Sequence, residues 1–181
     1  MARIGSGKTL STSPAAAKRP IVDCGDLGIR IARDGIWFYR ASPINRLPLV
    51  KLFAAVLSRD PDGGYALVTP VERGRVEVED APFLAVEVTP RGKGREQQLI
   101  FRTNLDEIVT AGPEHPLRVA TAAGGQPAPY ILVRGGLEAK LTRAVFYELV
   151  ELGHYEPVAA ERQFGVWSGG AFFALGDSGE E

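Results

Sequence analysis

Apolar and polar residues alternate over much of the chain, which is the pattern of strands that bury one face. Residues 27–31 alternate in this way, and Asp34-Gly35 follows as a two-residue hairpin turn, because glycine readily adopts a positive φ. Residues 36–39 supply the returning strand. The pattern therefore predicts that the ordered part of the chain starts near Ile21 with a β-hairpin.

The spacing of apolar residues changes to that of a helix after this hairpin. Leu49 and Phe53 recur at helical intervals. Asn45 is a suitable N-cap, and Pro48 is tolerated in a first helical turn because its missing N–H needs no partner there. We therefore expect a first helix that begins after Asn45 and continues to Ser58.

Most of the remaining chain returns to short apolar or alternating segments separated by turns. The strands expected from these segments are residues 65–70, 75–80, 83–88, 99–103, 107–110, 116–120 and 130–134, with two more inside 164–175. A second helix is expected at residues 137–152, followed by a polar connection. So many strands with two helices argue against a doubly wound parallel sheet. They predict an α+β fold with mostly antiparallel sheets.

One unit, a strand followed by an arginine, a short turn, a helix and another strand, occurs twice. With an offset of 94 residues, Arg40 aligns with Arg134 and Arg46 aligns with Lys140. This predicts two small roll-like lobes that share a strand–helix–strand motif. The arginines before each helix could hold an anion, because backbone N–H groups and the helix dipole favour negative charge there. They could equally pair with carboxylates or cover a sheet edge.

Several longer blocks of the sequence resemble a known bacterial family. In order over residues 23–175 they are "DLGIRIARDGIWFYRASPINRLPLVKLFAAVL", "YALVTPVE", "VEDAPFLAVEV", "FRTNLDEIVTAGPEHPLRV", "PYILVRGGLEAKLTRAVFYELVE" and "GVWSGGAFF". Together they are similar to the family called domain of unknown function 1285. The resemblance implies a small N-terminal α/β roll and a larger β-rich C-terminal roll that carries the second helix, with repeated motifs between them. It brings no established activity, and a role in signalling or ligand sensing is a proposal for that family.

The pattern and the resemblance together divide the chain into four segments. Residues 1–20 and 177–181 are expected to be disordered tails on their composition. Residues 21–82 are expected to form the N-terminal α/β roll. Residues 83–176 are expected to form the C-terminal β-rich roll with one helix.

Composition narrows the functional classes. Of the 181 residues, 45% are hydrophobic and 24% are charged, as in an ordinary soluble protein. With 21 basic and 22 acidic residues the net charge is -1, which gives no broad positive field for nucleic acid. No stretch has the roughly 18 apolar residues of a membrane span, and we find no signal-peptide pattern. The single Cys24 cannot form an internal disulfide, so we expect a cytoplasmic protein.

The sequence shows no complete catalytic or metal-binding set, so we expect a non-catalytic binding module with a role in bacterial signalling or regulation. Its site would be a groove between the two lobes that binds a small anionic molecule or a partner protein. No cofactor, metal, nucleic acid or membrane partner is expected. The candidate ligand-binding residues are Arg40, Arg46, Thr103, Asn104, His115 and Arg134.

Two other functions stay open at this point. His115 follows Glu114 in a proline-flanked loop, and a histidine beside a carboxylate is a candidate general base for a hydrolase. The chain's other histidine, His154, is expected at a helix end, which argues against a zinc site. Alternatively, an exposed edge strand at residues 171–175 could pair between two copies and make a homodimer.

Overall fold

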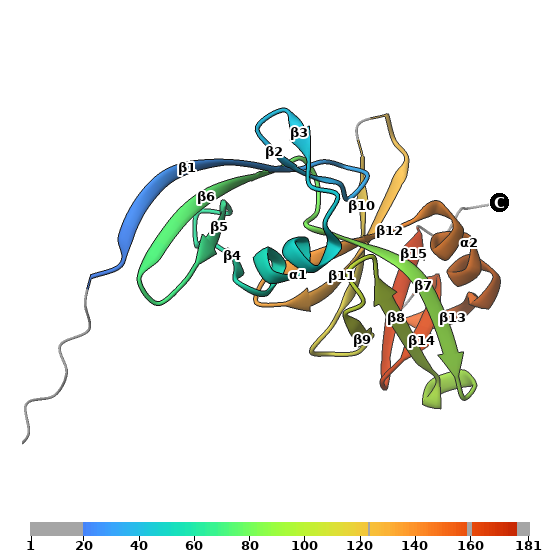
Figure 1. Ribbon diagram of the computed structural model, residues 1–181. Coiled ribbons are helices and arrows are strands. Elements are labelled where there is room, and N and C mark those ends of the chain that lie inside the picture. The colour runs from blue at the N-terminus through green and yellow to red at the C-terminus, as the bar shows by residue number, and fades with distance from the viewer. Residues whose placement is uncertain (1–19, 123, 159–160, 177–181) are drawn as a thin grey trace, which may run out of the picture.

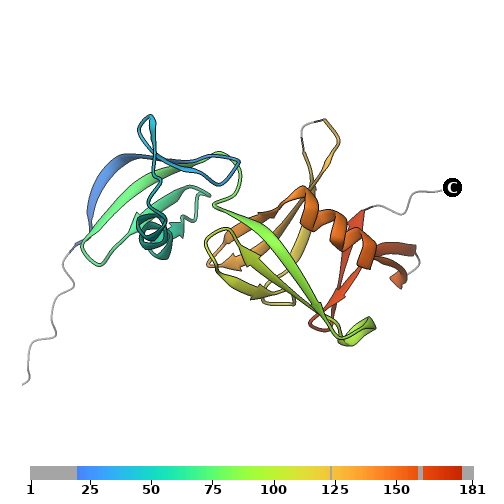
Figure 2. The ribbon, with the colours of Figure 1, turned by 45° about the vertical axis from the view of Figure 1, so that its right-hand side comes forward.

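The computed structural model describes residues 20–122, 124–158 and 161–176, which form two domains that lie side by side (Figure 1). Apart from Pro20, the tails expected at residues 1–20 and 177–181 fall outside the described residues. Each domain combines one α-helix with mostly antiparallel strands (Figure 2). The predicted α+β class with two helices is confirmed.

The N-terminal domain is a single sheet of six strands with a helix against it. The strand order is β3-β2-β1-β6-β5-β4, in which β1 and β6 pair in parallel and the other neighbours are antiparallel. The helix buries Val50 and Ala54. The elements are β1 (Val22–Ile31), β2 (Trp37–Tyr39), β3 (Ser42–Pro43), α1 (Leu47–Ala55), β4 (Leu57–Arg59), β5 (Tyr65–Val68) and β6 (Glu72–Val78).

The C-terminal domain has a six-stranded sheet in the order β10-β11-β12-β7-β8-β9 and a three-stranded sheet in the order β13-β14-β15. Helix α2 packs on β7 and β14, and so contacts both sheets. The elements are β7 (Phe83–Arg91), a short 3-10 helix (Gly94–Glu96), β8 (Gln98–Thr103), β9 (Ile108–Thr110), β10 (Leu117–Thr121), β11 (Pro127–Arg134), β12 (Leu137–Leu141), α2 (Arg143–Leu152), β13 (His154–Val158), β14 (Glu161–Ser168) and β15 (Ala171–Gly176).

A buried serine joins the two sheets of the C-terminal domain. Ser168 is fully buried, and its hydroxyl donates to the Ala111 carbonyl at 2.7 Å. The same oxygen accepts a hydrogen bond from the Leu99 backbone N–H at 2.8 Å. Because both roles of the hydroxyl are used by backbone groups, the three-stranded sheet is held against the six-stranded one.

The first hairpin forms at Asp34-Gly35, but its loop has the three residues 33–35 and not the predicted two, because the Ala32 N–H donates to the Ile36 carbonyl and the Gly35 N–H donates to the Ala32 carbonyl. Strands β1 and β2 are antiparallel, with Ile31 opposite Trp37. The Asp34 carboxylate accepts a hydrogen bond from the Ile36 N–H at 3.1 Å, and Gly35 has a φ of +81°. The turn therefore depends on the positive φ that a glycine adopts without strain.

The first helix is shorter than the sequence predicts. Its N-cap is Arg46, without a side-chain capping bond, so the expectation of Asn45 as the cap is wrong. The helix ends at Ala55 rather than Ser58, because the chain from there already runs as β4 beside β5. Tertiary pairing thus ends the helix before its apolar pattern does.

The second helix begins later than the sequence predicts, because residues 137–141 form strand β12. Their sequence, LEAKL, is rich in helix formers. The first, third and fifth residues are nevertheless buried in alternation, and β12 pairs with β11 on one side and β7 on the other. Helix α2 follows Thr142, whose hydroxyl accepts a hydrogen bond from the Val145 N–H. Residues 154–158, predicted as a polar connection, form β13.

The two domains repeat one order of elements, as predicted. Three strands, a helix and three strands occur as β1-β2-β3-α1-β4-β5-β6, and again as β10-β11-β12-α2-β13-β14-β15. Strand β6 pairs with β1, and β15 likewise lies beside β10. Strands β7, β8 and β9 are an addition that extends the second sheet from β12.

The repeat does not make the two arginines equivalent. The turns that correspond in the two units are residues 40–41, between β2 and β3, and residues 135–136, between β11 and β12. Arg40 therefore lies inside its turn, whereas Arg134 is the last residue of the strand before its turn. Their side chains consequently start from different backbone positions.

Candidate functional site

The two domains meet around the segment that connects β6 to β7. Asp80 in this segment accepts a hydrogen bond from the Tyr130 hydroxyl at 2.7 Å and forms an ion pair with Lys140. Burial opposes ionisation of Asp80, but hydrogen bonds from Lys140 and Tyr130 outweigh it and lower the pKa of this carboxyl. Burial and the Asp80 carboxylate raise the pKa of Tyr130 to about 12. The connection is thereby fixed to the C-terminal domain.

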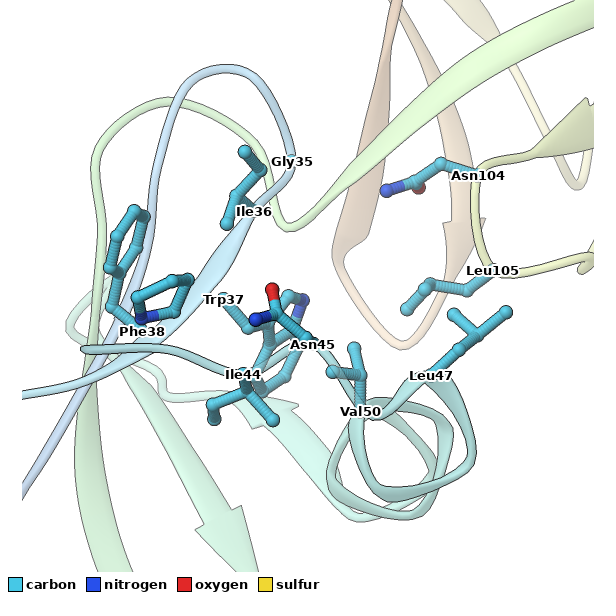
Figure 3. A pocket seen from close by; sticks show the side chains of 11 residues that line it. Gly35, Ile36, Trp37, Phe38, Ile44, Asn45, Leu47, Val50, Asn104 and Leu105 are labelled. Atoms are coloured by element: carbon cyan, nitrogen blue, oxygen red, sulfur yellow. The ribbon is translucent and has the colours of Figure 1, made fainter.

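A cleft of about 420 Å³ lies at this junction, and we call it the neutral cleft (Figure 3). Its walls are the first hairpin and helix α1 of the N-terminal domain and the loop after β8 of the C-terminal domain. None of its lining residues is charged, and most are apolar. They are Gly35, Ile36, Trp37, Phe38, Pro43, Ile44, Asn45, Leu47, Val50, Asn104 and Leu105.

Trp37 is the largest buried side chain of the neutral cleft. It is 1% exposed, and its ring stacks on Phe53 of α1 with centroids 6.4 Å apart. Figure 3 shows the indole beside Ile44 and Val50, with its nitrogen on the side that faces the C-terminal domain. This buried Nε1 has no hydrogen-bond partner among the described residues. An unpaired buried donor costs about 1–3 kcal/mol.

Asn104 brings a polar group to the cleft from the other domain. Its side-chain Oδ1 accepts a hydrogen bond from the Leu84 N–H at 3.0 Å, and its backbone N–H donates to the Leu84 carbonyl at 2.8 Å. These bonds fix the carboxamide and turn Nδ2 toward Gly35, where an added Cβ would lie 2.8 Å from that nitrogen. Gly35 is therefore required both for its positive φ and for the close approach of the domains.

A second cleft of about 400 Å³ shares Leu105 with the first, and we call it the charged cleft. It is lined by Lys51, Ala55, Leu105, Glu107 and Arg134. Lys51 from α1 forms an ion pair with Asp106 of the C-terminal domain, with Nζ 2.6 Å from Oδ2. The charged side chains of this cleft thus join the domains to each other.

Arg134 crosses the junction from the end of β11. It donates to the Ala54 carbonyl at 2.7 Å and lies 3.5 Å from the Leu57 carbonyl. Its Nε lies 3.0 Å from a carboxylate oxygen of Glu107. The last carbonyls of a helix have no partner within the helix and carry partial negative charge, so a cation there is favourable. Arg134 therefore caps α1 from the other domain, and its donors already have partners.

The other two candidate arginines are exposed on the N-terminal domain. Arg40 has a φ of +54°, and its guanidinium lies 5.3 Å from the centroid of the Tyr39 ring. Arg46 is the N-cap of α1. Neither side chain lines the neutral or the charged cleft. The three arginines therefore do not form one groove between the lobes.

The two candidates from β8 and its loop have different roles. Thr103 is fully buried, and its hydroxyl accepts hydrogen bonds from the N–H groups of Leu105 at 3.3 Å and Glu107 at 3.1 Å. It shapes the loop and is not open to a ligand. Asn104, the next residue, is the one candidate among the six that lines the neutral cleft.

His115 lies outside both clefts. Its ring is half-buried, and Nδ1 is 3.1 Å from the Leu132 carbonyl, which ties the loop to β11. The neighbouring Glu114 is exposed. This contact with a backbone carbonyl is structural, so the geometry gives no support to His115 as a general base.

The remaining expectations concern partners. Strand β15, the edge proposed for a homodimer, buries Phe173 and Leu175 and lies beside β10. Within the described residues, no three His, Cys, Asp or Glu side chains come together as a metal site. None of the helices in the described part of the chain is both long enough and apolar enough to cross a bilayer.

Trp37 was not among the residues predicted for the site. It is the first residue of β2, where its side chain is buried. Residues near β3, from α1 and from the other domain surround its indole N–H, and none of these described residues supplies an acceptor. A local sequence pattern cannot reveal this.

Comparisons with known proteins agree with this fold. The family model described as "Domain of unknown function (DUF1285), N-terminal domain" matches residues 16–81, and "Protein of unknown function (DUF1285), C-terminal domain" matches residues 82–175. The crystal structure of a DUF1285 family protein from Silicibacter pomeroyi DSS-3 is 45% identical, with a TM-score of 0.81 over 92% of this chain and 89% of that chain. Another, from Shewanella baltica OS155, is 30% identical, with a TM-score of 0.54 over 68% of this chain and 91% of that chain. No curated protein matches.

Proposed function

The chain belongs to the DUF1285 family, and we propose that it is a non-catalytic binding module whose site is the neutral cleft. Its ligand is a small, mostly apolar molecule with a hydrogen-bond acceptor that Trp37 contacts. A ligand seated between two domains influences how they are held together. That property suits a regulatory or signalling role, which we place in the bacterial cytoplasm.

The unpaired indole N–H carries this proposal. Buried polar groups in folded proteins nearly always have a partner, so an exception needs an explanation. Trp37 is almost completely buried, and its Nε1 is the one buried side-chain polar atom without a partner in the described part of the chain. An acceptor on a bound molecule would satisfy it.

The size and lining of the cleft support the same function. Small-molecule sites commonly have volumes of roughly 300–1,000 Å³, with apolar walls and a few polar groups that fix orientation. The neutral cleft, at about 420 Å³, lies within this range. Ile36, Ile44, Leu47 and Val50 supply apolar walls, and Asn45, Asn104 and Trp37 supply the polar groups.

Nuclear magnetic resonance tests the proposal on the protein itself. Each tryptophan gives one indole N–H signal, so the two tryptophans of the chain give two signals, and Trp37→Phe assigns them. Benzamide, hexanamide and methyl benzoate are then titrated as probes. We expect at least one probe to shift the Trp37 signal downfield as a hydrogen bond forms.

Trp167 is the internal control, because its Nε1 already donates to a Glu156 carboxylate oxygen at 3.0 Å. Its signal should stay in place while that of Trp37 moves. The proposal is wrong if no probe moves the Trp37 signal, or if both signals move together as they would in a general response to solvent.

A further inference from the structure

The neutral cleft also restricts the class of its ligand, on the premise that it is the binding site proposed above. We infer that the ligand is an uncharged molecule with a carbonyl group, such as an amide or ester, and that donors from both domains hold it. The donors are Nε1 of Trp37 from the N-terminal domain and Nδ2 of Asn104 from the C-terminal domain.

The first argument is the polarity of the available groups. Trp37 offers a donor and has no acceptor. The acceptor end of Asn104 is occupied by the Leu84 N–H, which leaves Nδ2 as the end that faces the cleft. Asn45 is exposed, so its carboxamide can turn to suit either role. The two fixed polar groups are therefore donors, and the ligand has to supply acceptors.

The second argument is the absence of charge. No described residue that lines the neutral cleft is charged. An ionised carboxylate would have to leave water without a countercharge, which costs several kcal/mol. The cations of the charged cleft already have partners, since Lys51 pairs with Asp106 and Arg134 pairs with Glu107. A neutral carbonyl keeps the hydrogen bonds and avoids this cost.

The third argument is the position of the donors on either side of the junction. Trp37 belongs to β2, and Asn104 is fixed to β7 through Leu84. The close approach of Asn104 to Gly35 keeps the two walls together. A ligand that contacts both donors therefore spans the two domains, and removing either donor should weaken binding.

Matched pairs of probes test the charge requirement. Hexanamide and hexanoate share a carbon chain, as do benzamide and benzoate, and differ in the charge of the head group at neutral pH. Titrations that follow the Trp37 indole signal should show each amide binding at least about tenfold more tightly than its carboxylate. Equal or tighter binding of the carboxylates overturns the inference and leaves the proposed function standing, whereas no response to any probe contradicts the proposed function.

Asn104→Asp tests the second donor. The carboxylate keeps an oxygen that can accept from the Leu84 N–H and replaces Nδ2 by an acceptor. We expect hexanamide affinity to fall by about tenfold or more. Gln98→Glu is the control, since it replaces a carboxamide by a carboxylate on an exposed residue of β8 that lines neither cleft, and it should leave hexanamide affinity unchanged.

Unchanged hexanamide affinity in Asn104→Asp, or an equal loss in Gln98→Glu, overturns the assignment of Asn104. A measurement on the unaltered protein covers the case in which Asn104→Asp does not fold. The side-chain amide signals of Asn104 should shift on addition of hexanamide together with the Trp37 indole signal. If the Trp37 signal moves while those of Asn104 stay in place, the ligand does not contact both domains.

Discussion

The neutral and charged clefts share Leu105 at one domain junction, yet their polar groups differ in whether they have hydrogen-bond partners. In the charged cleft, Arg134 and Lys51 have partners from within the chain, and the bonds from Arg134 to the Ala54 carbonyl and from Lys51 to Asp106 join the domains. In the neutral cleft, Trp37 is more deeply buried than either of them and has no partner among the described residues.

This difference separates groups that hold the fold together from groups that are free to hold something else. Charged residues attract attention in a sequence because they suit anions, but a charge that is already paired has little left to offer a ligand. A buried donor without an acceptor is a stronger indication, because folded proteins rarely leave one unpaired. At this junction the unpaired buried donor is Nε1 of Trp37, in the neutral cleft.

Among the substitutions that test this comparison, removal of the Arg134 guanidinium should lower the stability most. Arg134→Met keeps much of the aliphatic stem and leaves the Ala54 carbonyl and the Glu107 carboxylate without their partner. Hydrogen bonds that involve a charged group each contribute about 1.5–3 kcal/mol, and they are not additive. We expect the free energy of unfolding to fall by about 3 kcal/mol, measured by urea denaturation.

Arg46→Met is the matched control for that measurement. It removes a cation from the other end of the same helix, where the dipole disfavours positive charge and the side chain makes no capping bond. Its unfolding midpoint should equal that of the unaltered protein or exceed it slightly. If Arg134→Met matches Arg46→Met, the pairing in the charged cleft does not stabilise the junction.

Gly35→Ala should have the next largest effect on stability, and it probes a contact between the walls of the neutral cleft. The residue has a φ of +81°, and the new Cβ would lie 2.8 Å from Asn104 Nδ2 and 3.1 Å from a methyl carbon of Leu84. We expect a loss of about 2 kcal/mol, of which about half is backbone strain. Urea denaturation measures the sum.

Gly63→Ala separates the two contributions. Gly63 has a similar φ of +90°, but an added Cβ meets nothing within 4 Å, so this variant carries the backbone strain alone. Gly35→Ala should therefore be the more destabilised of the two. Equal losses would mean that the domains do not press together at Gly35, and that the walls of the neutral cleft are not fixed by this contact.

Local patterns in the sequence predicted much of the fold. Alternation and the Asp34-Gly35 turn predicted the first hairpin, because both are properties of adjacent residues. The strand at residues 137–141 was missed because its partners, β11 and β7, decide its conformation against the local helix preference. The repeat was visible in the sequence. The offset between the two units is not the same at the turns as at the helices, so the single offset of 94 residues aligned Arg40 with Arg134 incorrectly.

The candidate site was harder to predict, because it too depends on contacts between residues that are far apart in the sequence. Arg134 was selected for its charge, but that charge is used by Ala54 and Glu107, far from it in sequence. Asn104 was selected and does line the neutral cleft, with its orientation set by Leu84. Trp37 resembles a core residue in the sequence, and its unpaired N–H becomes visible only when the surrounding acceptors can be counted.

The smallest effect is expected for the ion pair at the rim of the charged cleft. Lys51 Nζ lies 2.6 Å from Asp106 Oδ2, but the two side chains are 40% and 54% exposed. Water and salt screen such pairs, and their contribution to stability is small. Arg134 is 37% exposed, but it also donates to the Ala54 carbonyl, whereas Lys51 makes this one ion pair, so Lys51→Ala should shift the urea midpoint far less than Arg134→Met does.

The pH dependence of Lys51→Ala provides a sharper measurement than its midpoint at neutral pH. The hydrogen bond from Lys51 is the main cause that holds the pKa of Asp106 below its ordinary value of 3.8. A carboxyl whose pKa is lower in the folded state stabilises it above that ordinary value, and the contribution is lost as the pH falls through the folded pKa. Any difference between Lys51→Ala and the unaltered protein should thus shrink in acid and in high salt. A difference as large as that of Arg134→Met, and insensitive to salt, would mean that Lys51 and Arg134 act as one network, and the contrast between a single exposed ion pair and the several hydrogen bonds of Arg134 would have to be abandoned.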